Sequence, residues 1–144
     1  MSTTHLKFIE WRDNNGLHKD TLRSLSDLKF MKDELQFLEN LVAAHALEVI
    51  SEASSEKSKE IKQELESHKE ILEKLLKELE LHSNNLQILM DDEDVPGELE
   101  VYKNEHYRLL IEEMNFHSAV KKTKKNIFDM LSEIFKKNKQ KKLT

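Results

Sequence analysis

The middle third of the chain carries residues in alternating steps of four and three, the spacing that gives one helix a continuous seam for packing against others. Two histidines occupy positions of this ladder where leucine is expected. Its members are Ile61, Leu65, His68, Leu72, Leu75, Leu79, His82, Leu86 and Leu89. The ladder predicts a long amphipathic helix whose packed face includes polar positions.

Similar ladders precede and follow this one. Few turn formers separate them, because the chain holds only 2 glycines and 1 proline in 144 residues. We predict helices over about 17–50, 56–90 and 98–137. The first seam comprises Leu28, Met31, Leu35, Leu38, Val42, His45 and Val49, and the third comprises Leu99, Tyr102, His106, Leu109, Glu113, Phe116, Val120, Thr123, Ile127, Met130 and Ile134.

Two segments are predicted to separate the helices. Continued in steps of seven, the first seam is two residues out of phase with the second, which turns the apolar face by about 200°. A continuous helix does not absorb such a slip, so we expect a turn near 51–55 with Ser54 or Ser55 as the N-cap. The acidic stretch 91–97 ends in proline and glycine and should terminate the second helix.

Short connections between long helices favour antiparallel neighbours. The sequence therefore predicts an all-α, antiparallel up-down-up bundle of three long helices with coiled-coil-like packing. We assign residues 17–137 to a single helical-bundle domain and residues 138–144 to a frayed basic tail. Residues 1–16 form an N-terminal segment whose apolar pattern over 4–13 fits a short extra helix, stopped by the sequence Asn-Asn-Gly.

The apolar surface is wider than one seam. A second stripe on the third helix and two phenylalanines beside the first seam make up the excess, namely Leu110, Met114, Phe128, Leu131, Phe135, Phe30 and Phe37. Three helices leave part of this surface uncovered, so either the N-terminal segment docks there or two chains associate. The alternative is the ordinary core of a monomeric bundle. We expect the partner to be another protein chain or a second copy, as in a homodimer.

Charge is divided unevenly along the chain. The formal net charge is −5, yet nine lysines lie between Lys121 and Lys142 against only Asp129 and Glu133. Such a basic end can attract an acidic protein or nucleic acid, although lysines near a helix C-terminus also stabilise the helix dipole. Few aromatic residues alternate with these lysines, so nucleic acid is not the expected partner.

Several polar residues are predicted to point into the bundle together. Folding the hairpins places His82 level with His106 or Tyr107, and Glu34 level with His117. The candidate cluster is Asp27, Glu34, His82, His106, Glu113 and His117, with Glu78 at its edge. Inward-facing carboxylates and imidazoles can hold a binuclear Fe, Mn or Zn site. They can equally form hydrogen-bonded layers that fix helix register.

The spacing of these residues departs from known metal-binding bundles. The ferritin-like Glu-x-x-His step and the hemerythrin His-x-x-x-His pair are both missing. The steps present are i,i+4 pairs such as Glu113 with His117, which are also common on helix surfaces. A second polar group, interpreted as structural, comprises His45, Glu64, His68 and Thr123.

No catalytic motif accompanies these features. The chain has no cysteine, no nucleophile elbow and no glycine-rich phosphate loop. It also lacks an apolar run of 18 residues, so we expect a cytoplasmic protein without membrane contact. We predict an interaction or scaffold protein without catalytic activity and without a cofactor. The alternatives are a metal-binding bundle, or a lysine-rich C-terminal helix that binds an acidic partner or nucleic acid.

Overall fold

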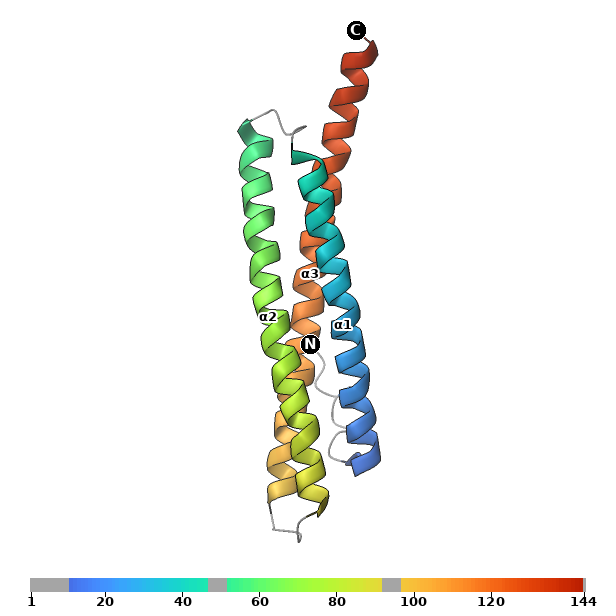
Figure 1. Ribbon diagram of the computed structural model, residues 1–144, viewed down its shortest axis with the longest axis vertical. Helices are drawn as coiled ribbons and strands as arrows, with labels where there is room; N and C mark the ends of the chain where they lie inside the picture. Colours follow the sequence, from blue (N-terminus) through green and yellow to red (C-terminus); the bar gives the residue numbers. More distant parts are fainter. Residues whose placement is uncertain (1–10, 47–51, 92–96, 144) are drawn as a thin grey trace. The chain divides into compact units, whose positions relative to one another are not determined.

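Three α-helices make up the part of the chain that the structure describes, which is residues 11–46, 52–91 and 97–143 of a computed structural model. The helices are α1 (Asn14–Ala44), α2 (Glu52–Asp91) and α3 (Glu98–Leu143) (Figure 1). They pack against one another, which confirms the predicted all-α, antiparallel up-down-up bundle. None of the described helices is apolar over a length that could span a bilayer.

The helices contribute to two compact units. Unit 1 combines Met1–Phe30 with Leu72–Asn115, and unit 2 combines Met31–Ile71 with Phe116–Thr144. Each unit therefore contains a segment of all three helices and has a core of its own. The prediction that 17–137 behaves as one domain stays a prediction.

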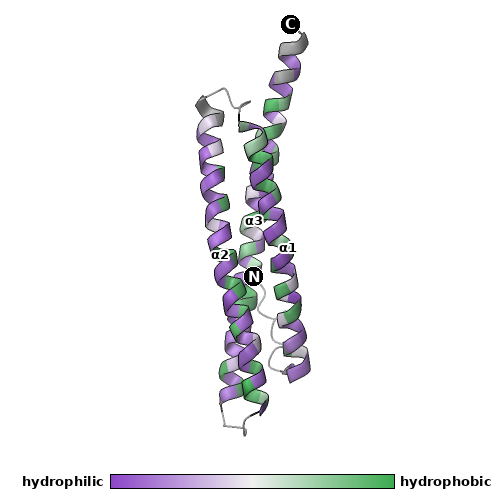
Figure 2. Ribbon diagram, in the orientation of Figure 1, coloured by the Kyte–Doolittle hydropathy of each residue, from purple (hydrophilic) through white to green (hydrophobic). Residues whose placement is uncertain are grey.

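The packed faces follow the 4-3 ladders. Along α2 every ladder position from Ile61 to Leu86 is buried, and along α3 the same holds from Tyr102 to Ile134. Figure 2 shows hydrophobic positions recurring among hydrophilic ones along each helix. Because heptad spacing keeps one stripe of a helix against its neighbours, the polar members of the ladders are buried with the leucines.

Helix α1 starts earlier than predicted. The Asp13 side chain accepts a hydrogen bond through Oδ1 from the Gly16 N–H at 2.7 Å, which makes Asp13 the N-cap. Residues 14–16, expected to stop a short N-terminal helix, instead form the first turn of α1. Most of that expected helix, residues 4–10, lies outside the described residues.

The other helix ends also differ from the predictions. Helix α2 begins at Glu52, so the prediction of Ser54 or Ser55 as N-cap is wrong. Serine and glutamate are tolerated in a first helical turn, and composition alone gives no sharp boundary there. Helix α3 continues past residue 137 to Leu143, because lysine is a good helix former and stabilises a helix C-terminus.

Candidate functional site

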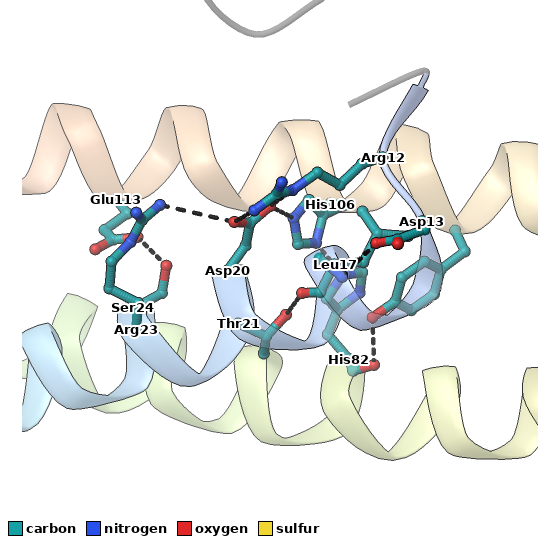
Figure 3. A network of polar contacts seen from close by, with 12 residues as sticks. Arg12, Asp13, Leu17, Asp20, Thr21, Arg23, Ser24, His82, His106 and Glu113 are labelled. Atoms are coloured by element: carbon teal, nitrogen blue, oxygen red, sulfur yellow. Dashed lines mark hydrogen bonds and ion pairs between the residues drawn. The ribbon is translucent and has the colours of Figure 1, made fainter. Parts of the chain in front are cut away.

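A row of polar side chains crosses the core of unit 1. Asp20 on α1, His106 on α3 and His82 on α2 are 3, 2 and 3 % exposed. His106 Nε2 lies 3.2 Å from Asp20 Oδ2, and His106 Nδ1 lies 2.9 Å from His82 Nε2 (Figure 3). We call these three residues the polar row. It joins all three helices by hydrogen bonds inside the core.

Burial determines the protonation state of the two imidazoles. It lowers the pKa of His82 to about 4, with the nearby His106 acting in the same direction, and it also lowers the pKa of His106. Both rings are therefore neutral at pH 7. Since the Asp20 carboxylate only accepts hydrogen bonds, His106 donates its Nε2–H to it. The unprotonated His106 Nδ1 then accepts a hydrogen bond from His82 Nε2–H.

Two arginines compensate the charge of Asp20. Arg12 lies directly before the N-cap, and its Nη2 is 3.1 Å from Asp20 Oδ1. Arg23, one turn after Asp20 on α1, approaches the same oxygen at 3.8 Å. An uncompensated buried carboxylate is strongly unfavourable, and these two cations offset the cost of burying the Asp20 side chain.

Tyr102 holds His82 from a second direction. The two rings stack with centroids 4.0 Å apart and an interplanar angle of 5°. The Tyr102 hydroxyl donates to the His82 carbonyl oxygen at 3.1 Å, and burial raises the pKa of Tyr102 to about 12. The orientation of His82 is thus fixed by a ring contact, a backbone contact and its hydrogen bond to His106.

A further polar contact lies along the same seam. Ser24 on α1 donates its hydroxyl to Glu113 Oε2 on α3 at 2.5 Å, and both residues are buried. Asp20 and Ser24 are one turn apart on α1, whereas His106 and Glu113 are two turns apart on α3. Helices α1 and α3 of unit 1 are therefore joined by polar contacts at two successive levels.

The six predicted cluster residues are placed in different surroundings. His82, His106 and Glu113 are buried in unit 1, as the ladders predict. Asp27 in unit 1 and His117 in unit 2 are exposed, so the prediction that they face inward is wrong. The half-buried Glu34 in unit 2 forms an ion pair with Lys124, with Oε1 2.9 Å from Nζ.

Helical phase explains the two misplaced residues. A fixed 100° per residue drifts by about 20° per heptad from the 3.5-residue repeat that packed helices follow. On a wheel drawn at 100° per residue, this drift places Asp27 too close to the apolar arc of α1. In the structure Asp27 directly precedes the buried Leu28 and is exposed. His117 likewise follows the buried Phe116 on α3.

Sequence reasoning missed the α1 members of this site. Asp20, Thr21 and Ser24 are 3, 1 and 2 % exposed. A usable signal existed for two of them, because extending the first seam backward from Leu28 in steps of four and three reaches Ser24, Thr21 and Leu17. Asp20 lies beside that seam, and no apolar pattern points to it.

Metal binding by the six-residue cluster has no geometric support in the described residues. Within 11–46, 52–91 and 97–143, no three or more His, Asp or Glu side chains are grouped so that they could hold an ion. Glu78, considered at the cluster's edge, instead accepts from Arg108 Nη2 at 3.1 Å. That the protein binds Fe, Mn or Zn stays a prediction.

Arg108 is the centre of a surface ion-pair group on unit 1. It pairs with Glu105, with Glu112 through Nη1 at 2.6 Å, and with Glu78. Hydrogen bonding to Glu105 and Glu78 raises the pKa of Arg108, and the same contact lowers the pKa of Glu105. These groups are partly exposed, so solvent screening limits their effect on stability.

Unit 2 has a smaller polar group of its own. The Thr123 hydroxyl on α3 donates to Glu64 Oε2 at 2.9 Å and accepts from His68 Nε2–H at 2.8 Å. Glu64 and His68 both lie on α2. The buried His68 Nδ1 has no hydrogen-bond partner among the described residues, and burial lowers the pKa of His68. His45, predicted with this group, makes an edge contact with Phe135 at 5.2 Å between ring centroids.

Replacing Thr123 with valine should lower the free energy of unfolding by about 1–2 kcal/mol, because the His68 Nε2–H would lose its acceptor in the core. Urea denaturation at pH 7 measures this difference. Ser118→Ala on the exposed face of α3 is the control, and it should change stability by less than about 0.5 kcal/mol. Equal effects of the two variants would contradict a buried role for Thr123.

The chemistry of the polar row favours structure over catalysis. His82 and Tyr102 border an open groove of ≈ 910 Å³ that also contains Asn85, Glu105 and Arg108. A histidine whose pKa is about 4 is a weak base at neutral pH, whereas an efficient general base has a pKa near the working pH. A polar layer of this kind instead fixes the register and orientation of packed helices.

Comparisons of the chain with protein-family models, with curated proteins and with solved structures found no match.

Proposed function

We propose that the chain is a helical-bundle interaction module that binds an acidic amphipathic helix of a partner protein through unit 2. The observation that supports this is a set of exposed aromatic residues where α1 and α3 meet. Phe37, Phe128 and Phe135 are 58, 46 and 50 % exposed. We call these three residues the phenylalanine strip.

The three phenylalanines lie along one seam between α1 and α3. The Glu34–Lys124 ion pair and the ring contact between His45 and Phe135 mark that seam. Phe37 follows Glu34 by one turn, and Phe128 follows Lys124 by one turn, and residues three or four apart share a helix face. Exposed large apolar residues gathered on one face are typical of a protein-interaction site.

Lysines border the strip on α3. Lys121 and Lys125 precede Phe128 by seven and three residues, Lys139 follows Phe135 by four, and all three lysines are exposed. An apolar helix face flanked by carboxylates complements this arrangement. Two copies of the chain packed through α3 would bring these lysines together, so charge repulsion disfavours a homodimer through this surface.

A pair of synthetic peptides tests the proposal. Each has about 28 residues, or four heptads, with leucine on one face, flanked by glutamate in one peptide and by lysine in the other. In fluorescence anisotropy we expect the glutamate peptide to bind the intact protein at least about tenfold more tightly than the lysine peptide does. Its affinity should fall as the salt concentration rises. Equal affinity of the two peptides would overturn the proposal.

Two matched double variants locate the binding surface. Phe128→Ser combined with Phe135→Ser should weaken binding of the glutamate peptide at least tenfold, because two apolar contacts of about 1.5–3 kcal/mol each are removed. Leu81→Ser combined with Ile88→Ser is the control, since these α2 residues have the same seven-residue spacing and are 61 and 58 % exposed.

Three outcomes would contradict binding of an acidic partner helix by the phenylalanine strip. An equal loss of binding in the control variant would overturn the strip as the binding surface. A dimer in light scattering that only the phenylalanine variant dissociates would make a second copy the occupant. Binding to vesicles of anionic lipid, lost in the same variant, would make a membrane surface the occupant.

A further inference from the structure

A groove in unit 1 lies between the C-terminal part of α2 and the N-terminal part of α3. Its volume of ≈ 910 Å³ is within the range of about 300–1,000 Å³ that is usual for small-molecule sites. Leu89 on α2 and Val101 on α3 provide apolar walls, and Asn85 and Asn104 add amide groups. The groove therefore combines apolar surface with a few polar groups, as binding sites for small organic molecules do.

His82 offers one ring nitrogen to this groove. Its Nε2 is bonded to His106 Nδ1, whereas the His82 Nδ1 has no hydrogen-bond partner among the described residues. Of the buried side-chain nitrogen and oxygen atoms in those residues, only His68 Nδ1 lacks a partner. The His82 Nδ1 is therefore not enclosed by the core, although the residue as a whole is 3 % exposed, and the open space that His82 lines is the groove.

The polar row determines what this nitrogen can bind. Asp20 accepts a hydrogen bond from His106, and His106 accepts one from His82 Nε2–H, so the single proton of the neutral His82 ring is on Nε2. The His82 Nδ1 carries a lone pair and can only accept a hydrogen bond. A ligand that contacts this nitrogen must therefore bring an N–H or O–H donor.

Negative charge surrounds the same part of the groove. Glu105 lines the groove, and its charge acts on the His82 ring. Arg108, which also lines it, is already paired with the three carboxylates of Glu78, Glu105 and Glu112. One positive charge thus faces three negative ones, and Glu98 on the groove adds a fourth. A cationic ligand complements this arrangement.

We propose that the groove binds an organic amine in its ammonium form, with N–H groups that donate to His82 Nδ1 and to the Glu105 carboxylate. An ammonium group has three donors, so it can satisfy both acceptors at once. Leu89 and Val101 supply apolar surface for the carbon body of the ligand. This site shares no residue with the phenylalanine strip and is independent of the proposed partner helix.

Three indole compounds of similar size but different charge test the proposal on the full chain. Tryptamine carries an ammonium group, tryptophol a neutral hydroxyl and indolepropionate a carboxylate. In NMR titrations at pH 7 we expect tryptamine to bind at least about tenfold more tightly than tryptophol, and indolepropionate to bind most weakly. The His82 Nδ1 signal should shift as tryptamine binds, because this nitrogen gains a hydrogen bond. Absence of tryptamine binding, equal affinity for tryptamine and tryptophol, or an unchanged Nδ1 signal would overturn the proposal.

Two matched glutamate variants locate the ammonium group. Glu105→Gln should weaken tryptamine binding at least about tenfold, whereas Glu112→Gln should change it by less than about twofold. Both glutamates pair with Arg108 and are 45 and 39 % exposed, so each variant loses one charge and one ion pair. Only Glu105 lines the groove. Equal losses in the two variants would mean that the overall charge of the surface attracts the amine, and the groove would be overturned as its site.

Discussion

Replacing Asp20 with alanine should lower the free energy of unfolding by about 3 kcal/mol. The substitution leaves the His106 Nε2–H without an acceptor in the core and removes the carboxylate that Arg12 and Arg23 approach. A buried donor without a partner retains its full desolvation cost, while the lost ion pairs add to it. Urea denaturation at pH 7, followed by circular dichroism, measures the change.

Asp27→Ala is the matched control for this prediction. Asp27 lies seven residues after Asp20 on the same helix, but it is exposed. Its removal should change stability by no more than about 0.5 kcal/mol, as is usual for surface positions. Similar losses in the two variants would mean that Asp20 does not belong to a buried row and that the helical phase of α1 is different.

The ladders of α2 and α3 could be predicted because their spacing does not depend on what occupies each position. His82 and His106 continue a 4-3 pattern set by leucines on either side, so their burial follows from the pattern. Their contact also follows from folding α2 and α3 back on each other about a short connection, and the observed His82–His106 pair agrees with that register.

The α1 part of the site could not be predicted in the same way. Between Leu17 and Leu28 the seam of α1 is occupied by Thr21 and Ser24, so no apolar residue marks it. Asp20 is buried only because cations and His106 surround it, and a pattern of apolar residues carries no information on such partners. The position of Arg12 depends on how the chain enters α1, which local sequence does not specify.

Lowering the pH from 7 to 4 should destabilise the protein by about 3 kcal/mol through His82 alone. In the unfolded chain this imidazole binds a proton near pH 6.5, whereas in the folded protein burial and the adjacent His106 lower its pKa to about 4. Between these values the unfolded state holds the additional proton, so stability falls as the pH drops through this window. The lowered pKa values of His106 and His68 act in the same direction.

His82→Leu separates this contribution from general acid denaturation. Leucine suits a ladder position, so the variant should fold, although at pH 7 it leaves His106 Nδ1 without its donor. The difference in unfolding free energy between pH 7 and pH 4 should shrink by about 3 kcal/mol. His18→Leu, at an exposed position of α1, is the control substitution. An undiminished fall in stability in the His82 variant would show that carboxylates elsewhere, and not the polar row, make the fold sensitive to acid.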